Sequence, residues 1–162
     1  RPDMAKLFVD RPACESDADA ISTLIYPLLR YRAPVTVDPP PESFLAEFAP
    51  QAIRSHITDG HHGYLVARFE NQLIGVLGVR DNRHLLHLFV AEPYQRWGVA
   101  RMLWNHAKAD ALKTEDEIDM LVRSSVYAVP VYERFGFTAC GRRVDEPGVS
   151  YVPMRQVIRR SG

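Results

Sequence analysis

The stretch from His84 to Trp104 constrains the fold of this chain more than any other part of it. Its first half is apolar, and Ala91-Glu92-Pro93 ends it, because proline can neither donate to a sheet ladder nor continue most regular elements. We therefore predict a short, buried strand over residues 84–90. After the break, apolar residues return at the spacing of one helical face, at Val99, Met102, Leu103 and Ala107. The predicted unit is a strand, a tight turn and a helix.

The turn between these two elements predicts an anion site. Gly98 lets the backbone approach a ligand closely, and Ala100 adds almost no side chain. The first amides of the helix have no partner within it and point outward. Such amides bind anions, and phosphate above all. An ordinary strand-to-helix turn, with glycine required for packing, is the alternative interpretation.

Two motifs together resemble the GNAT superfamily of N-acetyltransferases. The first, Gln95-x-x-Gly98-x-Ala100 after an apolar strand, is similar to the family's acyl-CoA pyrophosphate signature, Q/R-x-x-G-x-G/A. The second runs from Ala128 to Phe137, contains Tyr132, and is similar to the helix-then-strand segment that closes the family's site. The order and separation of the motifs also match the family. The resemblance is clearest over residues 84–137.

This resemblance implies the GNAT fold, in the α/β or α+β class. The fold has a mixed, mostly antiparallel central sheet flanked by helices, with a splay between the fourth and fifth strands. The residue pattern agrees, and it predicts further strands over 7–9, 64–69, 73–79, 118–122, 137–142 and 150–158. The second and third of the chain's strands should form an antiparallel hairpin, because only residues 70–72 separate them.

Helix signals lie between these strands. A first helix is predicted from an N-cap at Ser16 to about Leu29, and a second across residues 44–53, with its apolar face interrupted by Pro50. The proline-rich residues 30–41 predict a surface loop. A later helix is expected to have caps at Ser124 and Ser125, to start late because of Pro130, and to stop at Gly136.

By the same resemblance, the co-substrate is acetyl-CoA. The turn would bind its diphosphate, with backbone amides contributing more than the charge of Arg96. Backbone groups of Phe89 and Val90 would bind the pantetheine arm along the splayed strand. Trp97 either covers the adenine or ribose or packs on the helix. The residues predicted to form the diphosphate site are Gln95, Arg96, Trp97, Gly98, Val99, Ala100 and Arg101.

Tyr132 corresponds to the family tyrosine that protonates the departing CoA sulfur. A phenol, with a pKa of about 10, is neutral at pH 7 and can donate a hydrogen bond to a thiolate. The alternative role for Tyr132 is that of a core aromatic at the helical spacing of Val129 and Phe135.

The acceptor amine must lose a proton before it attacks, so some group must accept that proton. Family members often use a glutamate on the central strand, but this strand has no acid and offers His84 and His87. On a regular strand the two histidines face opposite sides, His84 with Leu88 and His87 with Leu85, unless a bulge intervenes. A structural role for each histidine and a water relay both stay open.

The predicted function is transfer of the acetyl group of acetyl-CoA to a primary amine, on a small molecule or a peptide, by direct attack in a ternary complex. The alternative is a non-catalytic acyl-CoA-binding or sensing module with the GNAT fold. Two departures from the family keep it open: the missing central acid, and Arg123 where the family commonly has asparagine. Arg123 would contact an anionic substrate or be solvated.

By resemblance to the family, the residues that select the substrate are 26–41 and His61-His62.

Composition sets the remaining expectations. Twenty basic and twenty acidic residues cancel, so no electrostatic signature for nucleic acid or a membrane is visible. We expect one domain over residues 4–162, with residues 1–3 as an expression remnant. Cys14, Cys140 and the His61-His62 pair lack metal-ligand spacing, so no metal site is expected. Reduced cysteines and the lack of a signal peptide or spanning segment predict a cytoplasmic protein. Dimers are common in the family, so a homodimer stays open.

Overall fold

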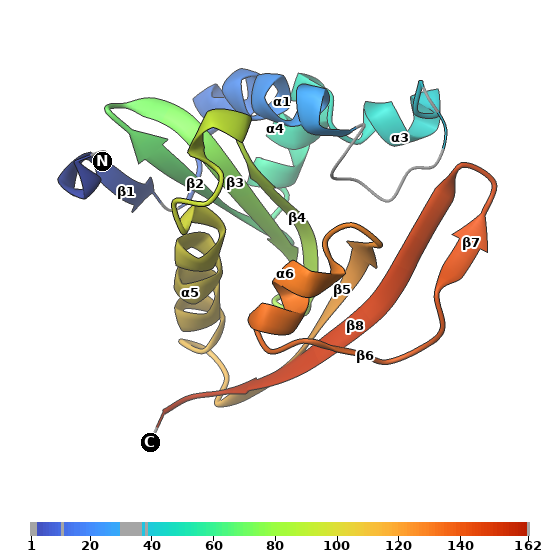
Figure 1. Cartoon of the computed structure of the whole chain (residues 1–162). Coiled ribbons are helices and arrows are strands. Elements are labelled where there is room, and N and C mark those ends of the chain that lie inside the picture. Colours follow the sequence, from blue (N-terminus) through green and yellow to red (C-terminus); the bar gives the residue numbers. More distant parts are fainter. Residues whose placement is uncertain (1–2, 11, 30–36, 38, 162) are drawn as a thin grey trace.

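A computed structural model describes residues 3–10, 12–29, 37 and 39–161 of the chain (Figure 1). Its centre is an eight-stranded sheet in the order β1-β2-β3-β4-β5-β8-β6, with β7 paired on β8. Neighbouring strands are antiparallel except β4 and β5, which run parallel. The predicted fold class, a mixed and mostly antiparallel sheet flanked by helices, is confirmed. The strands are β1 (Leu7–Asp10), β2 (His62–Phe69), β3 (Gln72–Arg80), β4 (His84–Val90), β5 (Glu117–Ser125), β6 (Thr138–Ala139), β7 (Val144–Glu146) and β8 (Val149–Arg159).

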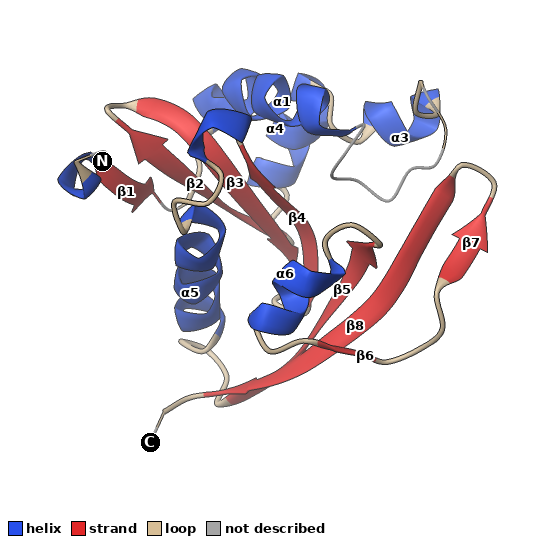
Figure 2. Ribbon diagram, in the orientation of Figure 1, coloured by secondary structure: helices blue, strands red, loops and turns tan. Residues whose placement is uncertain are grey.

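Helices cover both faces of this sheet (Figure 2). On one face α1, α3 and α4 bury Ile21 and Phe48 against Val76 of the sheet. On the other face α5 and α6 complete a second core, in which Leu103 packs with Met120. The sheet therefore separates two apolar cores. The helices are α1 (Ala18–Ile25), α3 (Glu42–Ala46), α4 (Pro50–Thr58), α5 (Val99–Ala111) and α6 (Val129–Arg134), and the 3₁₀ turns are η1 (Met4–Lys6), η2 (Glu15–Asp17), η3 (Tyr26–Leu28) and η4 (Glu92–Tyr94).

Two helix boundaries differ from the prediction. Ser16 lies inside η2 and is not the N-cap; the Asp17 carboxylate accepts the backbone N–H of Cys14 at 2.8 Å there. Pro50 begins α4 and does not interrupt a helix, because a proline in the first turn removes an N–H that has no helical partner. The one predicted helix over 44–53 is therefore two. The predicted loop over 30–41 lies mostly outside the described residues.

The chain around α6 follows the prediction in part. β5 continues through Ser124 and Ser125, so Ser124 is a buried strand residue and caps nothing. The Ser125 hydroxyl does accept the backbone N–H of Ala128, at 3.1 Å, just before α6. Gly136 ends the helix in a left-handed conformation with φ of +100°, as predicted.

The fourth and fifth strands diverge as predicted. Within the described residues β4 pairs with β5 only at His84–Leu121 and Leu85–Val122. Beyond that point β4 remains hydrogen-bonded to β3 on its other side. The β5-facing edge of β4 is therefore open over residues 86–90.

A β-bulge in β4 changes which side chains share a face. Leu85 lies opposite Val79 and His87 lies opposite Gly78, so Leu86 has no partner on β3. Leu85 packs into the α5 core, whereas the His87 ring contacts Phe48 on the other face, with ring centroids 4.9 Å apart. The expectation for a regular strand, that His87 shares a face with Leu85, is wrong. Alternation along β4 places His84 on the same face as His87.

Candidate active site

A cavity of about 1250 Å³ opens along the splayed edge of β4 and reaches the start of α5. Small-molecule pockets usually have about 300–1,000 Å³, so this cavity has room for two ligands together. It is lined by all the predicted site residues except Trp97, namely His84, His87, Phe89, Val90, Gln95, Arg96, Gly98, Val99, Ala100, Arg101 and Tyr132.

The first turn of α5 has the geometry of an anion site. Gly98 is left-handed, with φ of +82°, and its carbonyl accepts the N–H of Met102 at 3.0 Å, which opens the helical ladder. The three amides between them have no acceptor inside the helix. A Cβ on Gly98 would meet no atom within 4 Å, so the glycine serves backbone conformation and not packing. The packing interpretation of this turn is therefore not supported.

Two side chains of the motif hold the turn in place. The Gln95 side-chain amide donates to the carbonyl of Val90 at 2.9 Å, which ties the end of β4 to the turn. Trp97 packs edge-to-face on Tyr94 and Phe69, with centroid distances of 4.9 and 5.4 Å. The Trp97 side chain therefore packs against η4 and β2, and its contact with the adenine or ribose stays a prediction.

Positive charge surrounds the same turn. Arg101 donates to the backbone carbonyl of Arg134 at 3.0 Å and lies over the Phe135 ring at 4.9 Å, so it joins α5 to α6. Arg96 and Arg134 also line the cavity. Unpaired amides and guanidinium groups at one end of a cavity fit a diphosphate.

The open edge of β4 fits an extended, amide-containing arm. The N–H of Ala91 donates to Ile74 of β3 at 2.8 Å, so alternation directs the backbone groups of Phe89 to β3 and those of Leu88 and Val90 to the gap. Because the Val90 carbonyl already accepts from Gln95, Val90 offers its N–H to a ligand there. The sequence predicts Phe89 at this place and not Leu88, because the bulge that decides which residues face the gap depends on the partner strand.

Tyr132 faces the same cavity from α6. Its ring is 7% exposed and packs edge-to-face on Phe135 and Phe137, at centroid distances of 6.3 and 5.6 Å. Burial raises the pKa of the Tyr132 phenol well above its usual value. The phenol is therefore a neutral hydrogen-bond donor at physiological pH.

The two candidate histidines differ in environment. His84 is half-buried in the cavity wall. His87 is 8% exposed, and its Nε2 has no hydrogen-bond partner among the described residues. Burial, with the charges of His56 and His62, lowers the pKa of His87 to about 3. His87 is thus a neutral imidazole at pH 7 and a poor proton acceptor.

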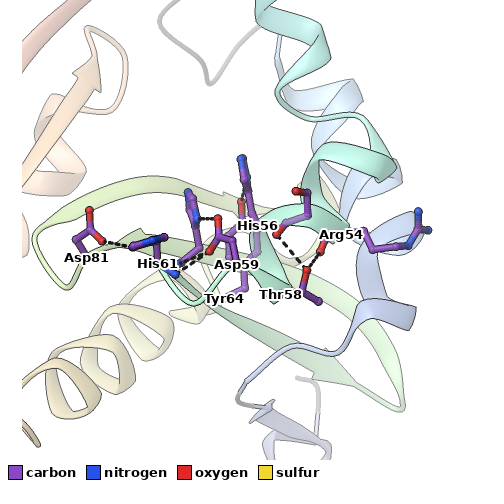
Figure 3. Close-up of polar contacts among 9 residues, drawn as sticks. Arg54, His56, Thr58, Asp59, His61, Tyr64 and Asp81 are labelled. Atoms are coloured by element: carbon purple, nitrogen blue, oxygen red, sulfur yellow. Dashed lines mark hydrogen bonds and ion pairs between the residues drawn. The ribbon is translucent and has the colours of Figure 1, made fainter.

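A cluster of polar side chains lies at the junction of α4 and β2 (Figure 3). The rings of His56 and His62 are stacked with centroids 4.1 Å apart, and His62 Nδ1 lies 2.6 Å from the Asp59 carboxylate. His56 Nδ1 lies 3.3 Å from the Tyr64 hydroxyl, and the Tyr64 ring meets the His87 ring edge-on at 5.9 Å. Burial, followed by the His62 charge, lowers the pKa of His56.

The chain matches a known protein family over most of its length. Residues 27–158 match the family described as an acetyltransferase (GNAT) domain, so the chain belongs to the GNAT acetyltransferase family. Acetyl-CoA is the co-substrate of this family, and the residues of the cavity fit it. A comparison with curated proteins finds no match.

Solved structures share the fold at low sequence identity. PaiA N-acetyltransferase from Thermoplasma acidophilum, in complex with coenzyme A, has 15% identity and a TM-score of 0.70 over 91% of this chain and 97% of that chain. A GCN5-related N-acetyltransferase from Rhodopseudomonas palustris has 14% identity and a TM-score of 0.75 over 98% and 99%. A mutant of the spermidine N-acetyltransferase SpeG from Vibrio cholerae has 22% sequence identity and a TM-score of 0.64, over 94% of each chain.

None of the helices in the described residues is both long and apolar enough to cross a membrane. No group of three or more histidine, cysteine or acidic side chains within the described part is placed to hold a metal ion. Cys14 and Cys140 are free and exposed.

Proposed function

We propose that the protein transfers the acetyl group of acetyl-CoA to a primary amine by direct attack in a ternary complex. One observation carries the proposal: a single cavity contains the unpaired amides of α5, the open edge of β4 and the Tyr132 phenol. These features can bind a diphosphate, bind an extended arm and donate a proton, which are the three functions that a thioester co-substrate requires.

Each part of the cavity has a role in the proposed reaction. The first turn of α5, with Arg96 and Arg101, binds the diphosphate. The backbone of Leu88 and Val90 aligns the arm, so that the thioester lies near the bulge. The amine nitrogen attacks the carbonyl carbon, and the carbon–nitrogen bond forms as the carbon–sulfur bond breaks. Tyr132 donates its phenolic proton to the departing sulfur, which leaves as the thiol, and the proton that the amine loses restores the phenol.

The proton lost by the amine needs an acceptor, since deprotonating an amine of lysine-like pKa at pH 7 costs roughly 4 to 5 kcal/mol. We assign this role to His84, directly or through a water molecule, because His84 is the accessible histidine of the cavity. His87, whose pKa is lowered by burial, is better suited to hold its face of the cavity rigid. The acceptor amine belongs to a small molecule or a peptide. A cytoplasmic location and a homodimer remain predictions.

The decisive experiment is thermal unfolding with acetyl-CoA, CoA or ATP, followed by an amine screen that detects the free thiol. A ligand at about a hundred times its Kd stabilises the fold by about 2.7 kcal/mol, which is several degrees of Tm for a chain of this size. We expect a shift with acetyl-CoA and CoA but not with ATP, and thiol release that depends on an amine.

The outcomes separate the enzyme from the non-catalytic alternative. A Tm shift without amine-dependent thiol release, across amino acids, peptides and polyamines, would favour a binding or sensing module. No shift at millimolar acetyl-CoA would rule out both functions.

A further inference from the structure

The ion pairs divide the described arginines into two groups. Outside the cavity, each of them except Arg142 contacts a carboxylate at 2.5–3.5 Å. The arginines that line the cavity have no such carboxylate among the described residues; they are Arg80, Arg96, Arg101, Arg123 and Arg134. The cavity thus keeps guanidinium groups available for ligands.

The cavity arginines lie on opposite faces of the sheet. Arg96, Arg101 and Arg134 belong to the α5 and α6 face, where the proposed diphosphate site accounts for them. Val122 is buried in the α5 core, so its neighbour Arg123 projects from the other face. Arg80 pairs with His84, which the bulge places on that same face. Arg80 and Arg123 are therefore not part of the diphosphate site.

These two arginines flank His84. Arg80, His84 and Leu121 are in register across β3, β4 and β5, and Arg123 lies two residues further along β5. In a regular ladder, with strands about 4.8 Å apart and a rise of about 3.3 Å per residue, the Cα atoms of Arg80 and Arg123 would be about 12 Å apart, and the divergence of β5 from β4 after Val122 widens this separation. Both residues line the cavity, so a ligand bound between them can contact both guanidinium groups.

The surroundings of Arg80 and Arg123 are consistent with two guanidinium groups on the His84 face of the sheet. The Arg123 guanidinium lies over the Tyr151 ring, 5.2 Å from its centroid, and this contact leaves the edge of its N–H groups free. Arg80 acts on the same face, since its charge contributes to the lowered pKa of His56. Carboxylates of Glu47 and Glu146 also line the cavity, so the acceptor side offers groups of both signs.

We propose that the acceptor amine carries a carboxylate, as an amino acid or a short peptide does, and that Arg80 and Arg123 bind this carboxylate. The proposal rests on the function proposed above and names its substrate class. Guanidinium groups recognise carboxylates through paired N–H donors. A purely cationic acceptor would meet the positive charges of Arg80 and Arg123 beside His84, which disfavours it in spite of the carboxylates of Glu47 and Glu146. A carboxylate on the acceptor removes that penalty and orients the amine toward the thioester.

The test compares acceptors that differ only in the carboxylate. The probes are amino acids, the corresponding amino acid amides, and spermidine as a purely cationic amine. We expect kcat/KM to be at least about tenfold higher for the acids, the size of a charge-assisted hydrogen-bond pair. Arg80→Gln and Arg123→Gln should raise KM for acids by about tenfold and leave KM for amides unchanged. Arg142→Gln is the matched control, because it removes an exposed arginine that lies outside the cavity and has no carboxylate partner among the described residues.

A second measurement needs no turnover. N-acetyl amino acids and N-acetyl amino acid amides are added to the CoA complex, and the Tm shift is compared. Preferential stabilisation by the acids, lost in Arg123→Gln, supports the proposal. Equal binding of both forms, or turnover of amides or spermidine as fast as of acids, overturns it while the acetyltransferase function stands. If acetyl-CoA itself does not stabilise the protein, the function proposed above fails instead.

Discussion

At the scale of single residues, the Tyr132 phenol is the group on which the proposed chemistry depends most directly. We predict that Tyr132→Phe lowers kcat by about tenfold to a thousandfold, toward the lower end of the roughly 10²–10⁴-fold that general-acid catalysis contributes. Phenylalanine retains the ring contacts with Phe135 and Phe137 but cannot donate to the departing thiolate. Steady-state rates of thiol release give kcat, and calorimetry gives the Kd of CoA.

The control for this change is Thr58→Val, which also removes one hydroxyl. Thr58 lies outside the cavity lining and loses only exposed hydrogen bonds to the Arg54 and Ser55 carbonyls. Its kcat should equal that of the wild type. Unchanged turnover of Tyr132→Phe, with CoA bound normally, would remove the assignment of Tyr132.

His87 has a consequence for acid stability. Its pKa is lowered to about 3 in the folded chain by burial and by the charges of His56 and His62, whereas a histidine in the unfolded chain titrates near 6.5. As the pH falls below about 6.5, the unfolded chain binds a proton that folded His87 does not. His87 therefore destabilises the fold progressively from about pH 6.5 down to about pH 3, by at most about 1.4 kcal/mol per pH unit.

We predict that His87→Gln has a flatter pH dependence of the free energy of unfolding. Urea denaturation at pH 7, 6 and 5 measures this slope, which should differ from the wild-type slope by up to about 1.4 kcal/mol per unit. The difference in slope is informative even if glutamine lowers stability at every pH. His61→Gln, which removes an exposed histidine, is the control. Identical slopes for wild type and His87→Gln would mean that His87 protonates freely in the folded state.

At the scale of elements, the start of α5 separates fold stability from co-substrate binding. A carboxylate in the first turn of a helix stabilises it by about 0.3–1 kcal/mol, yet it would repel a diphosphate at the same amides. We predict that the Ala100→Asp variant binds CoA at least about tenfold more weakly than the Ala100→Asn variant. Its free energy of unfolding should be no lower than that of Ala100→Asn. The asparagine variant has nearly the same shape without the charge. Calorimetry with CoA and urea denaturation measure the two effects, and equal CoA affinities in both variants would contradict an anion site here.

The elements differ in how far the sequence determines them. The unit from β4 to α5 is predictable because its signals, an apolar run, Pro93, Gly98 and a helical apolar face, are consecutive in the chain. The bulge at Leu86 is not, because it depends on how β4 aligns with β3. The position of Arg80 opposite His84 depends on the same alignment of β4 with β3. Local motifs therefore predict the co-substrate end of the cavity, while the acceptor end is set by contacts between strands.

At the scale of the whole molecule, the splay divides the sheet. β1 to β4 carry α1, α3 and α4, and β5 to β8 lie beside α6. Among the described residues, direct pairing across the division is limited to His84–Leu121 and Leu85–Val122, and α5 adds a shared core. A ligand in the gap therefore contacts both parts, which is why binding should raise the Tm of the whole chain.

The same division predicts where ligand binding changes amide hydrogen exchange. The amides of Leu88 and Val90 face the gap, whereas the Phe89 amide faces β3. We predict that saturating CoA slows exchange at Leu88 and Val90 much more than at Phe89, since local protection follows the hydrogen bonds that each amide makes. Exchange followed residue by residue by NMR measures this, with Phe89 as the control in the same strand. A uniform slowing of all three amides would indicate global stabilisation only, and no change at Leu88 and Val90 would mean that the arm does not bind along β4.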